Sequence, residues 1–404
     1  MIKKRTMVVL LIITMVLTSV ATFTISNVMQ LSTGSKILMS EDDFAYYKGL
    51  NERFGKVIEL QKQIDNKFYL ETEEVDYETG VIQGLFSSLE DPYSVYFTKA
   101  EFDSFMEQST GTYGGIGVYV SPGDDGLITV VSPIEDTPGE RAGLVSGDKI
   151  VKVNDEDVYG DKIDEAVSIM KGEPGTDVVL TIMRDQRDFF DVTITREQIV
   201  IKSVKSRVIN DDIGYLRITA FDEKSAQEFS DHLNTLKNQN VQGLIIDLRN
   251  NPGGSLDQVV KIADEILGKQ VIVYTKDRQG RERYERSDAA KVELPITVLV
   301  NGGSASASEI LTGAIKDSDS GTIIGTTTFG KGLVQEVIQL MDGSAFKITI
   351  SQYFTPNGSY INDIGIEPDI TIELPEELQY EADIQDEQDV QLQKAIEVLE
   401  ESIN

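Results

Sequence analysis

The stretch Pro295–Ser318, PITVLVNGGSASASEILTGAIKDS, gives the clearest structural pattern in this chain. It predicts a buried strand, a glycine turn, a run of small residues and then a helix. A turn of this kind places a side chain at a helix N-terminus, where oriented backbone N–H groups can receive an oxyanion. Ser304, Ser306 and Ser308 alternate here, and their spacing alone leaves open which one is a nucleophile. A helix N-cap by one of these serines is the plain structural alternative.

Strand and helix patterns alternate on both sides of this stretch, from residue 197 to residue 375. Amphipathic helices are predicted over 223–238 and 256–267. Apolar strands are predicted over 213–221, 243–250, 270–276, 295–301, 321–328 and 346–354. The alternation predicts an α/β region with a mostly parallel sheet and crossover helices.

The last segment, 376–404, is strongly acidic. Its apolar residues fall at helical spacing, at Val390, Ala395, Ile396, Leu399 and Ile403. The pattern predicts a helix and leaves two alternatives open: a solvated helix, or a contact with a partner subunit in a dimer.

Composition limits the chemistry. The chain has 404 residues, 40% of them hydrophobic, which is enough for two or three domains. With 37 basic and 68 acidic residues its formal charge is -31, which works against binding to nucleic acid or to an anionic membrane surface. The absence of Cys excludes disulfides, thiolate catalysis and Cys zinc sites. The single histidine, His232, lies beside the apolar stripe of a predicted helix, so a hydrolytic site here needs another base.

The N-terminal segment, residues 1–30, has the pattern of a membrane-targeting sequence. Basic residues in MIKKR precede a mainly apolar run from Met7 to Ile25, about the length that spans a bilayer. The flank offers no A-x-A site, which favours an uncleaved signal anchor, while a cleaved signal peptide remains the alternative. The basic residues stay in the cytoplasm, so we expect the rest of the chain outside it.

The following segment, 36–100, is predicted to be helical. One amphipathic helix carries an apolar stripe from Phe44 to Phe68, and a second runs from about Asp76 to Leu89. Two helices alone cannot close a core, so we expect this segment to pack on the main body or on a second copy of the chain.

From Tyr113 the chain changes to short strands and turns, and residues 101–196 resemble a PDZ domain of the bacterial protease type. The resemblance rests on the glycine loop and on AGLVSGDKIVKVN (142–154). Glycines let backbone N–H groups turn inward to hold a terminal carboxylate, and a peptide can add as a strand beside Val118–Val120. A tight strand entry is the plain alternative for the glycines. The expected peptide-binding residues are Gly114, Gly115, Ile116, Gly117 and Val118.

A second glycine-rich stretch, GTTTFGKG at 325–332, matches a phosphate loop up to its last position. The hydroxyl that should hold magnesium is replaced by Gly332. The residues that follow, LVQEVIQL, alternate like a strand, whereas a phosphate loop opens a helix. The sequence therefore does not predict a nucleotide site.

Three motifs together resemble the carboxyl-terminal processing proteases, also called tail-specific proteases. They are LRNNPGG (248–254), SASASEI (304–310) and FGKGLVQ (329–335). The resemblance covers nearly the whole chain after the apolar segment. It implies a nucleophile at Ser306, a general base at Lys331 and an orienting amide at Gln335.

The same resemblance implies backbone oxyanion donors at Ala307 and at Gly253 or Gly254, and leaves open which glycine donates. Asp317 matches a position that supports activity in some relatives, and an aspartate at a helix end is the plain alternative. No metal and no organic cofactor are implied.

A lysine base agrees with the chemistry of the residues. A serine hydroxyl is too weak an acid to attack a peptide unaided, and a lysine amine is the remaining common base. Its pKa must fall from about 10.4 to about 7 or 8, and burial lowers it by penalising the charged form. If the residues after Lys331 form a strand, Lys331 and Gln335 share a face, and the neutral amide can hold the amine.

The expected protein is a serine endopeptidase, anchored in the membrane or secreted. The resemblance implies protein substrates that the PDZ domain recognises through free C-termini, and a homodimer. The competing hypothesis is a catalytically silent PDZ adaptor at the cell envelope.

Overall fold

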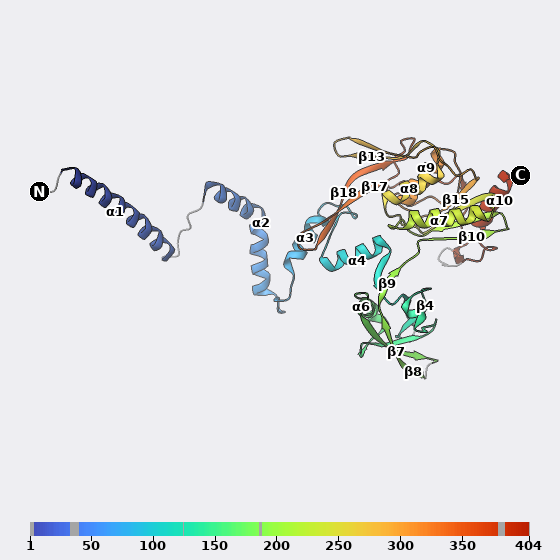
Figure 1. Cartoon of the computed structure of the whole chain (residues 1–404), viewed down its shortest axis with the longest axis horizontal. Helices are drawn as coiled ribbons and strands as arrows, with labels where there is room; N and C mark the ends of the chain where they lie inside the picture. The colour runs from blue at the N-terminus through green and yellow to red at the C-terminus, as the bar shows by residue number, and fades with distance from the viewer. Residues whose placement is uncertain (1–3, 33–39, 124, 186–187, 379–383, 404) are drawn as a thin grey trace. The chain divides into compact units, whose positions relative to one another are not determined.

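The computed structural model describes residues 4–32, 40–123, 125–185, 188–378 and 384–403. The chain divides into two compact units, Met1–Val81 and Ile82–Asn404. The first unit contains the helices α1 (Lys4–Ser32) and α2 (Glu41–Lys67), drawn in blue in Figure 1. The predicted start of the second segment at residue 36 lies outside the described residues.

The helices of the first unit expose much apolar surface. Within α1, the 19 residues Thr6–Thr24 have a mean hydropathy of 2.3, long and apolar enough to cross a membrane. Helix α2 begins at Ser40, whose side chain accepts a hydrogen bond from the Asp43 N–H, and none of its residues is buried. Its predicted apolar stripe is therefore exposed. The next helix, α3 (Tyr77–Ser87), has the predicted position.

A six-stranded, mostly parallel sheet forms the centre of the second unit, which confirms the predicted α/β class. Its order is β10, β11, β12, β15, β16, β19, and only β10 runs antiparallel to its neighbour. The strands are β10 (Val204–Ile209), β11 (Ile213–Ile218), β12 (Gly243–Asp247), β15 (Ile296–Val300), β16 (Thr322–Gly325) and β19 (Ile370–Thr371). Strands β12 and β15 are buried at every residue, as expected for a parallel sheet covered on both faces.

Helices cover both faces of this sheet. One apolar core joins it to the helices α7 (Ser225–Asn238), α8 (Leu256–Ile266) and α9 (Ala307–Asp317). A second core joins it to α10 (Val390–Ile403).

The C-terminal helix corrects one expectation. Its apolar stripe was expected to be solvated or to contact a partner subunit, but Ala395, Ile396 and Leu399 are buried against the sheet of their own chain. The acidic composition of the segment suggested a helix in solvent. In the structure, the acidic residues of α10 lie on its solvent-exposed face, and the opposite face packs in the core.

Two predicted strands do not belong to the parallel sheet. Segments 270–276 and 346–354 form β13 and β18 in a separate antiparallel sheet. Their side chains are only partly buried, which antiparallel sheets tolerate and parallel sheets do not. The members of this sheet are β1 (Val95–Phe97), β13 (Val271–Asp277), β14 (Glu282–Arg286), β17 (Leu333–Gln339) and β18 (Ala345–Phe354).

Residues 118–195 form a separate strand-rich domain with its own core, the green part of Figure 1. The strand order is β3, β4, β5, β7, β8, which leaves β3 at an edge, and β6 pairs with β5. The strands are β3 (Val118–Pro122), β4 (Ile128–Pro133), β5 (Lys149–Val153), β6 (Glu156–Asp157), β7 (Asp177–Arg184) and β8 (Asp188–Thr195). The domain also contains the helices α5 (Pro138–Arg141) and α6 (Ile163–Met170).

Short elements flank this domain in the sequence. Helix α4 (Lys99–Thr110) precedes β2 (Thr112–Gly115), and β2 pairs antiparallel with β9 (Glu197–Val200). The chain therefore enters and leaves the domain through one two-stranded ribbon.

Candidate active site

The structure distinguishes the three alternating serines. Ser304 is fully buried, and its hydroxyl donates to Leu248 O at 2.8 Å. Ser308 is also fully buried, and its hydroxyl donates to Asn251 O at 2.9 Å. Both serines are structural, because each hydroxyl ties the turn to the segment after β12. Ser306 is half-buried.

Ser306 immediately precedes α9 in a strained backbone conformation, with φ 54° and ψ -111°. Ser306 is the N-cap residue of α9 and its N–H donates to Glu309, as in a capping box. An ordinary N-cap residue adopts the β region, however, so capping alone does not account for this backbone geometry. A non-glycine residue at such a position costs about 1–3 kcal/mol. Nucleophilic serines at strand-to-helix turns accept this strain because the turn exposes the hydroxyl.

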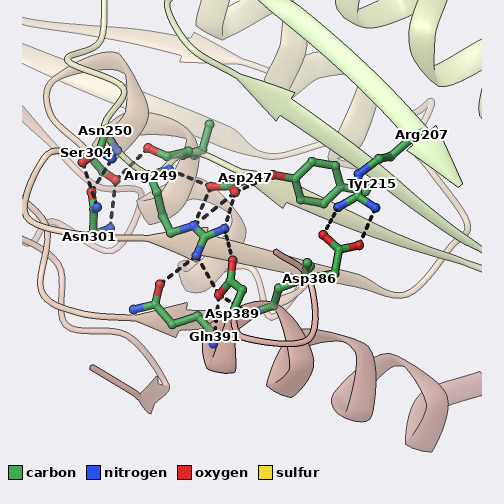
Figure 2. Close-up of polar contacts among 12 residues, drawn as sticks. Arg207, Tyr215, Asp247, Arg249, Asn250, Asn301, Ser304, Asp386, Asp389 and Gln391 are labelled. Carbon is green, nitrogen blue, oxygen red and sulfur yellow. Dashed lines mark hydrogen bonds and ion pairs between the residues drawn. The ribbon is translucent and has the colours of Figure 1, made fainter. Parts of the chain in front are cut away.

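An asparagine pair joins the serine turn to the loop after β12, as Figure 2 shows. Asn301 Oδ1 accepts hydrogen bonds from Asn250 N at 2.9 Å and Gly303 N at 3.0 Å. Asn301 Nδ2 donates to Asn250 Oδ1 at 2.9 Å. The loop that contains Gly253 and Gly254 is therefore fixed to the turn that contains Ser306.

Gly253 lies directly beside Ser306. A Cβ atom added at Gly253 would be 2.8 Å from Ser306 Cβ and 2.9 Å from Ala307 N, and φ here is +100°. Only glycine fits this position. The N–H of Gly253 donates to Asn251 Oδ1 at 2.9 Å. Within the described part of the chain, the N–H groups of Gly254 and Ala307 have no hydrogen-bond acceptor.

Lys331 lies on the segment between β16 and β17, with its Nζ 4.5 Å from the centre of the Tyr93 ring. Burial lowers the pKa of Lys331, and the charge of Lys347 lowers it further. The carboxylates of Asp91 and Glu309 act in the opposite direction, but the net pKa is below that of a free lysine. The direction is the one that a general base requires.

The fully buried Glu309 joins the serine and lysine segments. Its Oε2 accepts hydrogen bonds from the backbone N–H groups of Ser306 at 2.9 Å and Lys331 at 2.8 Å. Its Oε1 accepts from Gly330 N at 2.7 Å and from the Thr328 hydroxyl at 2.6 Å. One carboxylate therefore fixes the backbones of both predicted catalytic residues.

Tyr353 connects the same two residues through their carbonyl groups. Its hydroxyl lies 3.1 Å from Ser306 O and also forms a hydrogen bond with Lys331 O. Burial raises the pKa of Tyr353 well above that of a free tyrosine, so the hydroxyl keeps its proton. Glu309 and Tyr353 together hold the backbone segments of Ser306 and Lys331 next to each other.

The structure does not bring Gln335 to Lys331. The Gln335 amide donates to Thr349 Oγ1 at 3.3 Å, and a β-bulge separates Val334 from Gln335. Strand β17 begins only at Leu333, so Lys331 precedes the strand. The bulge and the late strand start break the alternation from which a shared face was expected.

Phe329, two residues before Lys331, is 56% exposed. Asp317 is the last residue of α9, and its Oδ2 accepts a hydrogen bond from Asn357 N at 2.8 Å.

Sequence reasoning missed the side chains that surround Lys331. Tyr93 and Asp91 come from the loop before β1, far away in the sequence, and no local pattern connects them to the lysine. Glu309 gave a readable signal, because a glutamate three residues after a serine at a helix start is a capping-box pattern.

The predicted peptide-binding loop is divided between two structures. Gly114 and Gly115 belong to β2 and pair with Gln198 and Glu197 of β9. Gly117, at φ +74°, begins the turn into β3, and its carbonyl accepts hydrogen bonds from Ile134 N at 2.9 Å and the Thr137 hydroxyl at 3.0 Å. A Cβ at Gly117 would be 2.3 Å from Thr137 Cβ, so this glycine is sterically required.

Comparison with known proteins identifies the class. Residues 212–372 match the model of peptidase family S41, residues 129–184 match a PDZ domain, and residues 15–101 match the N-terminal domain of the activating protease CtpB. The fold and the site thus define a PDZ-containing serine peptidase.

The relatives specify the family. The chain is 36% identical to the carboxy-terminal processing protease CtpA of Bacillus subtilis, over 81% of this chain and 70% of that protein. It is 40% identical to a carboxy-terminal-processing protease of Bartonella bacilliformis, over 81% and 76%. The chain belongs to the carboxy-terminal processing proteases of peptidase family S41.

A solved structure shares the fold. The crystal structure of a putative S41 protease from Bacteroides fragilis has a TM-score of 0.53 and 15% sequence identity to this chain. The match covers 79% of this chain and 90% of that one.

Proposed function

We propose that this peptidase cleaves protein substrates with Ser306 as nucleophile and Lys331 as general base. The observation that carries the proposal is the Glu309 carboxylate, whose Oε2 binds the backbone N–H groups of both residues. The strained backbone of Ser306 and the lowered pKa of Lys331 support it.

The reaction has two halves. The neutral amine of Lys331 takes the proton of the Ser306 hydroxyl as its oxygen attacks the scissile carbonyl carbon. The tetrahedral intermediate collapses, the lysine returns the proton to the leaving amine, and an ester to Ser306 remains. Lys331 then deprotonates a water molecule that hydrolyses this ester.

The oxyanion of each intermediate needs preorganised donors. The N–H of Ala307 is a suitable first donor, because it precedes the first hydrogen-bonded turn of α9. The second donor is a glycine of the 253–254 pair. Among the described residues the N–H of Gly254 has no acceptor, whereas Gly253 would have to release Asn251 Oδ1.

We assign the orientation of Lys331 to Gln335. This role requires the Gln335 amide to leave Thr349 Oγ1 and turn toward Nζ. A neutral amide suits the task, because it holds the amine without favouring its charged form.

The PDZ domain, proposed over residues 101–196, selects substrates by their C-termini. Strand β3 is at the edge of its sheet, so an extended peptide can add to it. Ile116, Gly117 and Val118 then supply backbone N–H groups to the terminal carboxylate, while Gly114 and Gly115 act through the β2–β9 ribbon.

We further propose boundaries, location and assembly from the same observations. Residues 1–30 anchor the chain in the membrane or target it for secretion, 36–100 is the helical N-terminal segment, 197–375 is the peptidase core and 376–404 is the C-terminal segment. The core lies outside the cytoplasm. The exposed stripe of α2 supports a homodimer.

The test follows an unfolded reporter protein that ends in apolar residues, incubated with the full chain in a neutral detergent. Wild type, Ser306→Ala and the control Ser402→Ala, an exposed serine of α10, are compared. We expect cleavage by wild type and control, and a loss of roughly 1,000-fold or more in Ser306→Ala. Cleavage by Ser306→Ala would contradict the nucleophile.

A second arm tests recognition. The same reporter with an amidated C-terminus should be cleaved more slowly, because the PDZ domain loses the charge it binds. Equal cleavage of both forms would contradict recognition through the C-terminus. Absence of cleavage by any form would favour the silent adaptor.

A further inference from the structure

A cavity of about 580 Å³ lies on the α10 side of the parallel sheet, at the carboxyl ends of β11, β12 and β15. Its volume is in the range of small-ligand sites. Neither Ser306 nor Lys331 lines it. Part of its wall appears in Figure 2, which shows Arg207, Tyr215 and Arg249 with their acidic partners.

Two of the four basic side chains in the wall are already neutralised. Arg207 binds Asp386 through two hydrogen bonds of 2.6 Å each, and its guanidinium is 4.8 Å from the Tyr215 ring centre. Arg249 binds Asp247 at 2.6 Å and Asp389 at 2.8 Å. These arginines hold the C-terminal segment to the sheet and leave no charge for a ligand.

The other two basic side chains, Lys205 and Arg217, are directly opposite each other on β10 and β11. Like charges in this register are destabilising. In the described part of the chain neither side chain has an ion pair or a hydrogen bond, although the chain as a whole has 68 acidic residues. The Nε of Arg217 is buried and has no acceptor.

Lys205 is exposed to solvent and Arg217 is half-buried, so the group that most needs a bound anion is the buried Nε of Arg217. Leaving a buried donor such as Arg217 Nε without an acceptor destabilises the fold. A bound anion would accept from Arg217 and would also separate its charge from that of Lys205. Arginine favours planar anions, because its fork of N–H groups matches the two oxygens of a carboxylate.

The rest of the wall is mixed, with the polar side chains of Ser206, Thr219, Asn250 and Asn301 beside an apolar part. Leu374, Leu378 and Leu392 line the cavity together with the Tyr215 ring. A free phosphate gains nothing from contact with apolar side chains. An anion attached to an aliphatic group can bury that group against them.

We infer that this cavity binds a carboxylate carried on an aliphatic group, as at the C-terminus of a peptide that ends in leucine. The source of the ligand rests on the proposed function, since a peptidase meets such termini in its substrates and releases them in its products. The site is separate from the PDZ domain. It lies behind the asparagine pair that fixes the serine turn, because Asn250 and Asn301 also line the cavity.

The test measures binding by isothermal titration to the full chain in a neutral detergent. The probes are acetyl-Leu-Leu with a free carboxylate, the same dipeptide as its amide, and inorganic phosphate. Wild type, Arg217→Gln, Lys205→Thr and the control Lys202→Thr are compared, since Lys202 does not line the cavity. A peptide site elsewhere keeps its binding in all variants, so only the component that Arg217→Gln loses is assigned to the cavity.

We expect the free carboxylate to bind wild type and control equally, and Arg217→Gln and Lys205→Thr to weaken this component about 10- to 100-fold. The amide and phosphate should bind at least 10-fold more weakly. Lys205→Thr should not lower the Tm, because it removes a like-charge repulsion. If Arg217→Gln does not fold, the affinity of Lys205→Thr for the free carboxylate tests the inference by itself.

Unchanged affinity in the variants would overturn the inference, as would equal binding of the amide. Phosphate binding as tight as that of the peptide would overturn the assignment of an aliphatic carboxylate as the ligand. The measurement involves no cleavage. A chain that binds in the cavity but cleaves no reporter would contradict the proposed function alone.

Discussion

Lys331 must be neutral to take a proton from Ser306, and its neighbours influence its charge in opposite directions. Burial and Lys347 lower its pKa, while Asp91 and Glu309 raise it. Asp91 is itself ionised. Burial opposes its ionisation, but hydrogen bonds from Ser94 and the Tyr93 N–H, together with Lys331, hold its pKa below the usual value. The acid limb of the pH profile of kcat/KM therefore reports this balance.

Replacing the two charged neighbours should move that acid limb in opposite directions. Lys347→Gln removes a positive charge, which raises the pKa of Lys331 and shifts the limb to higher pH. Asp91→Asn removes a negative charge and shifts it to lower pH. We expect each shift to be about 0.5 to 1 pH unit, measured with a soluble reporter at constant ionic strength. Shifts in the same direction, or none, would contradict Lys331 as the titrating base.

Glu309 is a positioning residue rather than a catalytic one. In Glu309→Gln, one acceptor oxygen becomes an NH2 group that faces backbone N–H donors, so the serine and lysine segments lose part of their shared anchor. We expect kcat to fall about 10- to 100-fold. Loss of the negative charge also lowers the pKa of Lys331, so the acid limb should shift to lower pH.

The matched control is Glu336→Gln on the exposed part of β17. A fall in kcat without a shift of the acid limb would show that Glu309 only stabilises the fold and does not influence the pKa of Lys331.

At the scale of elements, the sequence predicted most of the architecture. The helix over 256–266 and the buried strands β12 and β15 could be predicted because their apolar patterns are strong. The sequence did not reveal that β13 and β18 belong to a separate antiparallel sheet, because periodicity identifies a strand without identifying its partner.

The candidate site was predicted in part. Motif resemblance led to Ser306 and Lys331, and the structure brings their segments together through Glu309. The position of Tyr93, in the loop before β1, could not be predicted, because its contact with Lys331 joins two segments that are distant in the sequence. The expected pairing of Lys331 with Gln335 relied on an ideal strand, and the bulge at Val334 removes that basis.

Helix α10 provides a stability prediction at this scale. Leu399 is 1% exposed against the sheet, so Leu399→Ala should lower the free energy of unfolding by about 2–5 kcal/mol. Val390, 40% exposed on the same helix, serves as control, and its alanine variant should cost much less. Urea denaturation followed by circular dichroism measures both. If both variants lowered the free energy of unfolding by a similar small amount, α10 would not be part of the core.

At the scale of the whole molecule, the exposed stripe of α2 is the surface that the proposed homodimer would bury. Phe54 and Ile58 are 46% and 51% exposed in the single chain. Phe54→Asp should weaken the dimer about 10- to 100-fold, because a charge replaces an aromatic contact. Gln63→Asp, on the opposite face of α2, is the control. Analytical ultracentrifugation in a neutral detergent distinguishes the two variants, and a wild type that is monomeric would contradict the dimer.

The central claim is that one serine and one lysine perform the hydrolysis. The most direct measurement is reporter cleavage by Lys331→Ala, with Lys291→Ala as an exposed lysine control and Tm values to confirm folding. The account predicts that Lys331→Ala folds and loses roughly 1,000-fold or more of kcat, while the control keeps its activity. Turnover by folded Lys331→Ala at close to the wild-type rate would contradict the account.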